Sequence, residues 1–217
     1  MTSIPIDLKN KALETPKTNA AVVCPNEESV LLAVKEAKEI NLINPILIGK
    51  KSLIEKTANQ VNLEINSYNI IEINNEQEAA TVACKLAHED KVKIIIKGNL
   101  HTDILMRYYL KKEFNLIVGR RLSHIWHMTA QKLNKPLFIT DGALNVLPRV
   151  EIKLQILKNA VDFCNKLNIF KPKVAILSGT EDPIDSMPSS IEAQKVMELA
   201  NKENVDALVH GPLAFDN

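Results

Sequence analysis

Residues 20–49, AAVVCPNEESVLLAVKEAKEINLINPILIG, decide the fold class of this 217-residue chain. The apolar run from Ala20 to Cys24, closed by a Pro-Asn pair, predicts a buried strand. Residues 27–41 carry apolar side chains at close to helical spacing, and residues 45–49 form a second short apolar run. A buried strand, a helix and a second buried strand in this order are typical of a parallel βαβ unit.

The same alternation continues along the chain. Apolar runs predict strands at residues 68–73 and 92–96, and helical patterns fill residues 51–62 and 76–89. The connections are short, as in right-handed crossovers between neighbouring parallel strands. We therefore predict an α/β fold with mostly parallel sheets and helices on both faces, preceded by a polar N-terminal arm.

The second half of the chain is predicted to form further α/β structure. Apolar runs predict strands at residues 136–141, 173–177 and 207–210. Apolar residues at helical spacing predict a long helix from about residue 150 to 167. Residues 189–192, SSIE, are typical of a capped helix start. The long helix is predicted to turn one row of side chains inward: Ile152, Ile156, Leu157, Ala160, Val161 and Cys164.

The pattern changes near residues 118–121, where one sheet domain gives way to the next. We place a first α/β lobe at residues 1–119 and a partial second α/β lobe at residues 120–217. The last predicted strand runs into Gly-Pro-Leu-Ala-Phe-Asp-Asn, a strand-end loop of the kind that a covering helix usually follows. The second lobe is therefore expected to be incomplete.

Composition excludes several classes of protein. Lys and Arg total 27 against 26 acidic residues, so the net charge of +1 gives no electrostatic footprint for nucleic acid or for a membrane surface. Three widely spaced cysteines indicate a reducing compartment. The N-terminal residues lack a continuous apolar stretch, which predicts a cytoplasmic protein.

Four polar clusters follow predicted strands, where ligands bind in open parallel sheets. The first holds Lys97, Gly98, Thr102 and, one helical stretch on, Arg107. Gly98 lets the backbone approach a ligand closely, free N–H groups at a helix start favour an anion, and the arginine can clamp it. The alternative is an ordinary strand-to-helix turn with a solvated lysine and arginine.

The second cluster, residues 120–124, places two arginines beside Ser123 and predicts either a phosphate contact or a solvated face. In the third, Asp141 is a candidate for orienting or deprotonating a substrate group, and Asn145 for donating to a carbonyl or phosphoryl oxygen. The alternative is that Asp141 caps a turn. In the fourth cluster the Gly-Pro pair is expected to fix a loop, with Asp216 facing a cleft.

Common cofactor motifs are missing. The sequence has no GxGxxG after its first strand and no GxxxxGK[ST], so the dinucleotide and P-loop interpretations lose their main support. The histidines show no metal-ligand spacing such as HExxH, so no metal site is predicted. Spacing alone leads to an α/β enzyme with anion sites at strand ends.

The four clusters, in this order, resemble the phosphate acetyl/butyryl transferase family. Lys97-Gly98, Thr102 and Leu105-Met106-Arg107 resemble the family's KG…T…LR segment, and Leu122-Ser123-His124 resembles its LSH. Residues 135–148, KPLFITDGALNVLP, and residues 211–217, GPLAFDN, resemble two further family segments. The LSH and KPLF matches lean toward the butyryl branch, while His101-Thr102 leans toward the acetyl branch.

The resemblance implies a two-lobed fold like that of isocitrate and isopropylmalate dehydrogenases, with the active site in the cleft between the two lobes. It also implies a homodimer. It implies reversible transfer of an acetyl or butyryl group between coenzyme A and inorganic phosphate. Both are substrates, and neither a metal nor a permanently bound cofactor is expected. The alternative is a catalytically degenerate remnant that binds coenzyme A or phosphate, or a subunit of a split enzyme.

The resemblance also assigns roles to residues. Arg107, Asp141 and Asn145 are the expected catalytic residues. The residues expected to bind phosphate or coenzyme A are Lys97, Gly98, Thr102, Arg107, Ser123, Gly211, Pro212 and Asp216.

Overall fold

The computed structural model describes residues 4–117, 119–129, 135–142 and 144–216, which divide into two compact units, Met1–Val118 and Gly119–Asn217. The first unit is built on a parallel sheet with the strand order β3-β2-β1-β4. Its strands are β1 (Thr18–Val23), β2 (Ile43–Gly49), β3 (Asn69–Glu72) and β4 (Ile94–Lys97). The parallel sheet predicted from the sequence is confirmed.

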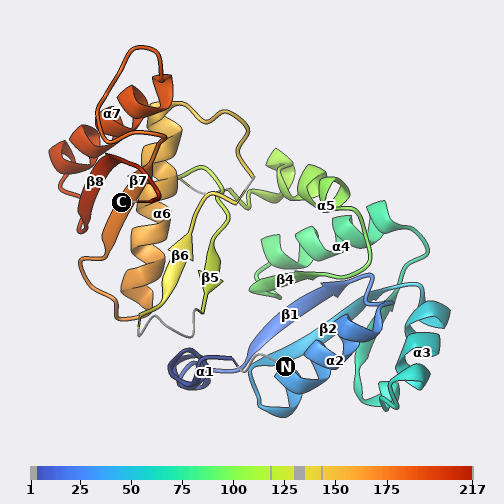
Figure 1. The fold of residues 1–217 in the computed structure, drawn as a ribbon. Helices are drawn as coiled ribbons and strands as arrows, with labels where there is room; N and C mark the ends of the chain where they lie inside the picture. The colour runs from blue at the N-terminus through green and yellow to red at the C-terminus, as the bar shows by residue number, and fades with distance from the viewer. Residues whose placement is uncertain (1–3, 118, 130–134, 143, 217) are drawn as a thin grey trace. The chain divides into compact units, whose positions relative to one another are not determined.

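Helices cover both faces of this sheet (Figure 1). The side chain of Val22 points to the face covered by α2 (Glu28–Glu39) and α3 (Lys51–Gln60), where it packs with Leu31 and Ile54. Its neighbours Ala21 and Val23 point to the opposite face, covered by α4 (Glu76–His88) and α5 (Thr102–Tyr109). Because neighbouring side chains on a strand point to opposite faces, burial on both faces requires the continuous apolar run seen in β1.

Three short helical segments complete the first unit: α1 (Ile6–Leu13), η1 (Ile65–Ser67) and η2 (Lys112–Phe114). The predicted polar N-terminal arm contains α1, a helix that the sequence analysis did not predict. None of the residues of α1 is buried in the structure.

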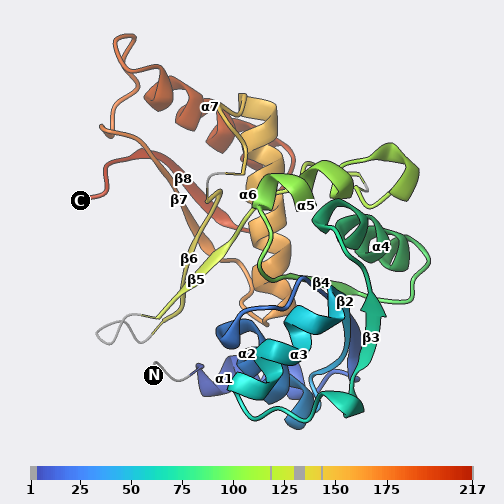
Figure 2. The same ribbon diagram turned by 90° about the vertical axis from the view of Figure 1, so that its right-hand side faces the viewer.

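The second unit contains two separate strand pairs. A short antiparallel pair joins β5 (Trp126–Met128) to β6 (Leu137–Ile139), and the two strands run side by side in Figures 1 and 2. A parallel pair joins β7 (Lys173–Leu177) to β8 (Leu208–Leu213). The other strand pairings described in the two units are parallel, so the arrangement is mostly parallel as predicted. Strand β6 is shorter than the predicted strand 136–141.

The core of the second unit lies between α6 (Val150–Lys166), α7 (Pro188–Lys202) and one face of the β7–β8 pair. Val174 and Ile176 of β7 join this core, whereas Leu177 remains 56% exposed. Among the described residues, helices therefore pack on one face of this pair, not on both as predicted. The buried side chains of α6 are Leu154, Ile156, Leu157, Val161 and Cys164.

The helix start predicted at residues 189–192 is confirmed to within one residue, but the predicted side-chain cap was wrong. Helix α7 begins at Pro188, and its N-cap residue Met187 makes no side-chain cap hydrogen bond. Ser190 is fully buried inside the first turn, where its hydroxyl accepts from the Ile184 N–H at 2.9 Å and donates to the Met187 carbonyl at 2.8 Å. This serine ties the preceding loop to the helix and does not cap a later start.

No helix in the described ranges is long and apolar enough to cross a membrane.

Candidate functional site

The strand order of the first unit has a reversal point between β1 and β4. The chain moves outward from β1 to β2 and β3, then returns to place β4 on the other side of β1. In open α/β sheets, ligands bind outside the carboxyl ends of the strands at such a point. Cys24 directly follows β1 and Gly98 directly follows β4, so these two residues lie at the edge where a ligand is expected.

Gly98 lies where two backbone segments approach closely. Its N–H donates to the Val23 carbonyl at 2.8 Å, and the Asn99 N–H donates to the Cys24 carbonyl at 2.8 Å. A Cβ on Gly98 would lie 2.4 Å from the Cys24 oxygen and 2.7 Å from the Val23 oxygen. Only glycine fits this turn, which brings the ends of β1 and β4 together.

Lys97 stabilises the same turn. Its ammonium group donates to the Gly98 carbonyl at 3.1 Å and to the Leu100 carbonyl at 2.9 Å. The residue also lines a cavity of about 390 Å³ beside α2. Two of the three donor positions of the ammonium group are therefore used within the turn.

The structure separates the remaining members of the first cluster. Thr102 is the exposed first residue of α5, while Arg107 lies in its last turn, about 7 Å further along the helix axis. Arg107 is exposed, and its guanidinium lies 3.5 Å from the carboxylate of Asp103, one turn earlier. Within the first unit, Arg107 thus projects from the solvent face of α5 with a weak ion pair as its partner.

Burial raises the pKa of the Cys24 thiol from its ordinary value of 9.0 to about 11, and the negative charge of Glu76 adds to the effect. Because the thiolate is the reactive form, we expect the alkylation rate of Cys24 in the folded chain to keep rising through pH 10. In urea the rate should be half-maximal near pH 9.0, the ordinary pKa of the thiol, and level off above it. The unfolded thiol loses its proton first, so this group should lower the free energy of unfolding between pH 9 and about 11.

Peptide mass spectrometry after iodoacetamide pulses measures this rate separately for each cysteine. Cys84 provides an internal comparison, because its thiol pKa is also raised to about 11 but its side chain is fully buried. In a Cys24→Ser variant the alkylated peptide that contains position 24 disappears, which identifies that peptide in the mass spectrum. A rate that is already half-maximal near pH 9.0 in the folded protein would contradict the expected burial of the Cys24 thiol.

In the second unit, Asp141 and Asn145 form one hydrogen-bonded network. One carboxylate oxygen of Asp141 accepts from the His124 N–H at 2.6 Å. The other accepts from the backbone N–H and the side-chain amide of Asn145, each at 2.7 Å. The carboxylate therefore joins the 141–145 turn to the segment around His124, and this geometry favours the turn-capping alternative for Asp141.

Ser123 and Arg121 belong to the same network. The Asn159 side-chain amide, on α6, donates to the Ser123 hydroxyl at 2.9 Å and to the Arg121 carbonyl at 2.8 Å. Arg121 in turn donates through Nε to the side-chain oxygen of Asn145 at 3.0 Å. The structure thus brings together Ser123, Asp141 and Asn145 of the predicted site with Arg121 of the second cluster, and adds Asn159, which the sequence did not single out.

His124 packs tightly within this network. Its ring lies edge-on to that of Trp126, with 4.8 Å between the ring centroids, and its Nδ1 atom is buried without a hydrogen-bond partner among the described residues. A Cβ on Gly142 would lie 2.5 Å from that Nδ1 and 2.8 Å from the indole nitrogen of Trp126. Glycine at position 142 is therefore required by the packing of the two rings.

The fourth predicted cluster does not form the expected loop. Gly211 and Pro212 are buried residues inside β8, and a Cβ on Gly211 would lie 2.7 Å from Cβ of Ile176. The pair therefore belongs to a close strand contact, which corrects the prediction that it fixes a strand-end loop. Asp216 lies beyond the strand and is exposed.

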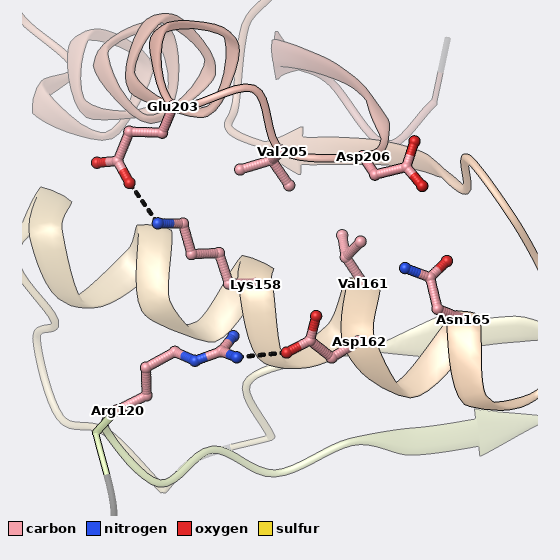
Figure 3. A pocket seen from close by; sticks show the side chains of 8 residues that line it. All are labelled: Arg120, Lys158, Val161, Asp162, Asn165, Glu203, Val205 and Asp206. Atoms are coloured by element: carbon pink, nitrogen blue, oxygen red, sulfur yellow. Dashed lines mark hydrogen bonds and ion pairs between the residues drawn. The ribbon is translucent and has the colours of Figure 1, made fainter.

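A cavity of about 450 Å³ lies beside α6, and Arg120 of the second cluster lines it (Figure 3). Most of its charged groups neutralise one another: Arg120 pairs with Asp162, and Lys158 pairs with Glu203. None of the predicted site residues lines it. Within the described ranges, no group of three or more His, Cys, Asp or Glu residues is arranged to hold a metal ion.

Comparison with known proteins identifies the family. A family model described as phosphate acetyl/butaryl transferase matches residues 74–217, a range that contains every predicted site residue. The phosphate acetyltransferase of Rickettsia felis is 37% identical over 214 residues, which cover 98% of this chain and 61% of that protein. The phosphate butyryltransferase of Clostridium beijerinckii is 31% identical over 212 residues, which cover 97% of this chain and 70% of that protein.

Solved structures agree with these sequence matches. A branched-chain phosphotransacylase from Enterococcus faecalis V583 superposes with a TM-score of 0.76 at 26% identity, covering 92% of this chain and 69% of that one. The chain spans about 60% of the length of the first curated relatives. It belongs to the phosphate acetyl/butaryl transferase family.

Proposed function

We propose that this chain carries out the reversible transfer of an acetyl or butyryl group between coenzyme A and inorganic phosphate. The observation that carries the proposal is the family match, because it covers both the Gly98 turn and the Asp141–Asn145 network. Relatives named for the acetyl and for the butyryl reaction are both similar to the chain, so the proposal keeps both acyl groups.

In the proposed reaction, a phosphate oxygen attacks the carbonyl carbon of the acyl-coenzyme A thioester. The new C–O bond forms, the C–S bond breaks, and coenzyme A leaves as the thiolate, so no acyl-enzyme bond is needed. The protein must hold two anionic substrates in line and stabilise the oxyanion that develops on the carbonyl oxygen.

We assign the phosphate-binding role in the first unit to Arg107, with Thr102 and the Lys97-Gly98 turn. An exposed guanidinium held only by Asp103 can exchange that weak ion pair for a phosphate, which it binds through two parallel hydrogen bonds. In the second unit we propose that the loop containing Asp141 and Asn145 takes part in catalysis. We propose that Ser123 and Asp216 contribute to substrate binding.

Several features of the whole protein are also proposals. We propose that the two units correspond to two lobes, that coenzyme A and phosphate are substrates and not bound cofactors, and that the protein acts as a cytoplasmic homodimer. The three cysteines are free thiols, a state that a reducing compartment preserves. Sedimentation equilibrium of the purified chain tests the dimer.

Phosphate-dependent release of free thiol from acetyl-CoA or butyryl-CoA tests the proposed reaction. We expect turnover by the purified 217-residue chain, and a fall in kcat/KM of about 100-fold or more in Arg107→Ala, because a charged donor to the reacting phosphate is lost. Arg149→Ala removes another exposed arginine, outside the assigned residues, and should leave the rate unchanged.

Thiol release that does not depend on phosphate would indicate hydrolysis and contradict the proposal. A chain that is folded by circular dichroism yet turns over neither substrate would favour the alternative function, that of a non-catalytic remnant or a subunit of a split enzyme.

A further inference from the structure

Arg121 is held at both its backbone and its side chain. Its backbone N–H donates to the side-chain oxygen of Gln155 at 2.7 Å, and its carbonyl accepts from the side-chain amide of Asn159 at 2.8 Å. Both partners lie on α6, so the helix fixes the position of the Arg121 backbone. Its Nε then donates to the side-chain oxygen of Asn145 at 3.0 Å, which sets the direction of the guanidinium.

Asn145 is itself held in one orientation. Its side-chain amide nitrogen donates to the carboxylate of Asp141 at 2.7 Å and to the Leu122 carbonyl at 2.9 Å. With both donors engaged, the amide oxygen is left to face Nε of Arg121. Asp141 thus orients Asn145, and Asn145 orients Arg121.

The outer edge of the Arg121 guanidinium is open. In the part of the chain that the structure describes, its two terminal nitrogens have neither a hydrogen-bond partner nor a carboxylate within ion-pair distance. The neighbouring Arg120 is different, because its guanidinium is neutralised by Asp162 (Figure 3). Of these two adjacent arginines, only Arg121 presents an oriented and uncompensated cation.

An arginine in this state suits a phosphate group. Its two terminal nitrogens present parallel donors that match two phosphate oxygens, and fixing Nε in advance lowers the entropy cost of binding. We propose that Arg121 binds a phosphate group of the substrates, either inorganic phosphate or a phosphate of coenzyme A. Asn145 and Asp141 act as its positioning residues. This inference rests on the proposed function and adds a phosphate contact in the second unit.

Fluorescence of Trp126 reports ligand binding close to Arg121. Trp126 is the only tryptophan of the chain, and its ring packs against His124, which is bonded to Asp141. Titrations of the full chain with inorganic phosphate, coenzyme A and dephospho-coenzyme A give a Kd for each probe. We expect Arg121→Ala to weaken binding of at least one phosphate-bearing probe about tenfold, a difference of about 1.4 kcal/mol.

Two variants separate this effect from a general loss of charge. Arg120→Ala removes the neighbouring arginine and should leave every Kd unchanged. Arg121→Lys keeps the charge but loses the two-nitrogen fork, so it should recover only part of the affinity. Thermal unfolding of each variant establishes that it is folded. Unchanged affinities in Arg121→Ala, or an equal loss in Arg120→Ala, would overturn the proposal.

The probes distinguish the two sources of phosphate. A loss confined to inorganic phosphate assigns Arg121 to the attacking phosphate. A loss for coenzyme A that disappears with dephospho-coenzyme A, which lacks the 3′-phosphate, assigns it to that group of coenzyme A. An equal loss for both coenzyme forms assigns it to the diphosphate. Each result supports phosphate binding by Arg121.

A double-mutant cycle tests the positioning role. We expect Asn145→Ala to weaken phosphate binding through Arg121, so adding it to Arg121→Ala should cause no further loss. Fully additive losses would overturn the positioning role. Because these are binding measurements, they also separate the two proposals: binding through Arg121 without turnover contradicts only the acyltransferase function, and turnover with binding unaffected by Arg121→Ala contradicts only this inference.

Discussion

Gly98→Ala is expected to destabilise the first unit by about 3 kcal/mol, because the added methyl group has no room. Its position lies 2.4 Å from the Cys24 oxygen and 2.7 Å from the Val23 oxygen, and both are backbone atoms that cannot rotate away. The turn must open, which breaks the hydrogen bonds that Gly98 and Asn99 donate across to β1. The same opening should remove any ligand site at this end of the sheet.

Urea unfolding followed by tyrosine and tryptophan signals measures this change. All three tyrosines lie in the first unit and the single tryptophan lies in the second, so the two signals report different units. We expect Gly98→Ala to shift the tyrosine transition. Gly179→Ala is the matched control, since its Cβ would meet only the flexible end of Met187 at 3.0 Å. Equal stability of the two variants would contradict the close packing at Gly98.

Asp141→Ala is expected to destabilise the second unit by about 3 kcal/mol, because hydrogen bonds to a charged group contribute about 1.5 to 3 kcal/mol each and are not fully additive. The change leaves the His124 N–H, the Asn145 N–H and the Asn145 side-chain amide without their common acceptor. Arg121 should also lose its fixed orientation, since Asn145 is no longer held.

Trp126 fluorescence during urea unfolding measures this loss directly, because the indole packs against His124. Asp162→Ala is the matched control in the same unit: it removes an exposed carboxylate whose partner is Arg120, and should cost no more than about 1 kcal/mol. If Asp141→Ala were no more destabilising than Asp162→Ala, Asp141 would not be the anchor of the 141–145 turn.

Much of the fold could be predicted from short-range sequence patterns. The run at residues 20–24 predicted the central strand, because a strand covered on both faces needs apolar residues at every position. Helix α6 was predicted within one residue of its end. The row of inward residues was less well predicted: the structure buries Leu154, whereas Ile152 and Ala160 are only partly buried. The other four predicted residues, Ile156, Leu157, Val161 and Cys164, are buried as expected. Leu154 joins the core through its packing with Val196 and Ala200 of α7.

The elements that were missed or wrongly bounded are those that depend on contacts with other segments of the chain. Strand β5 was not predicted, and β6 was predicted as the longer strand 136–141. Each has three residues, too few for a period-two pattern, and the two strands are held by their pairing with one another. The start predicted for α7 lies one residue from the observed one, but the predicted cap was wrong, because the Ser190 hydroxyl bonds to Ile184 and Met187 of the preceding loop.

The candidate site was predicted as separate clusters, and only the structure shows which of them meet. Asn159 reaches Ser123 across 36 positions of sequence, and Asn145 reaches Arg121 across 24. Contacts at such separations leave no periodic signal in a single sequence. Arg121 was therefore not distinguished from its neighbour Arg120, although the structure gives the two arginines different partners.

The most direct test of the central claim is isotope exchange with the purified chain, acetyl phosphate, radiolabelled inorganic phosphate and a catalytic amount of coenzyme A. Reversible acyl transfer predicts that label enters acetyl phosphate only when coenzyme A is present, and that Arg107→Ala slows this entry about 100-fold or more. A folded chain that incorporates no label, or that incorporates it equally well without coenzyme A, would contradict the proposed acyl transfer.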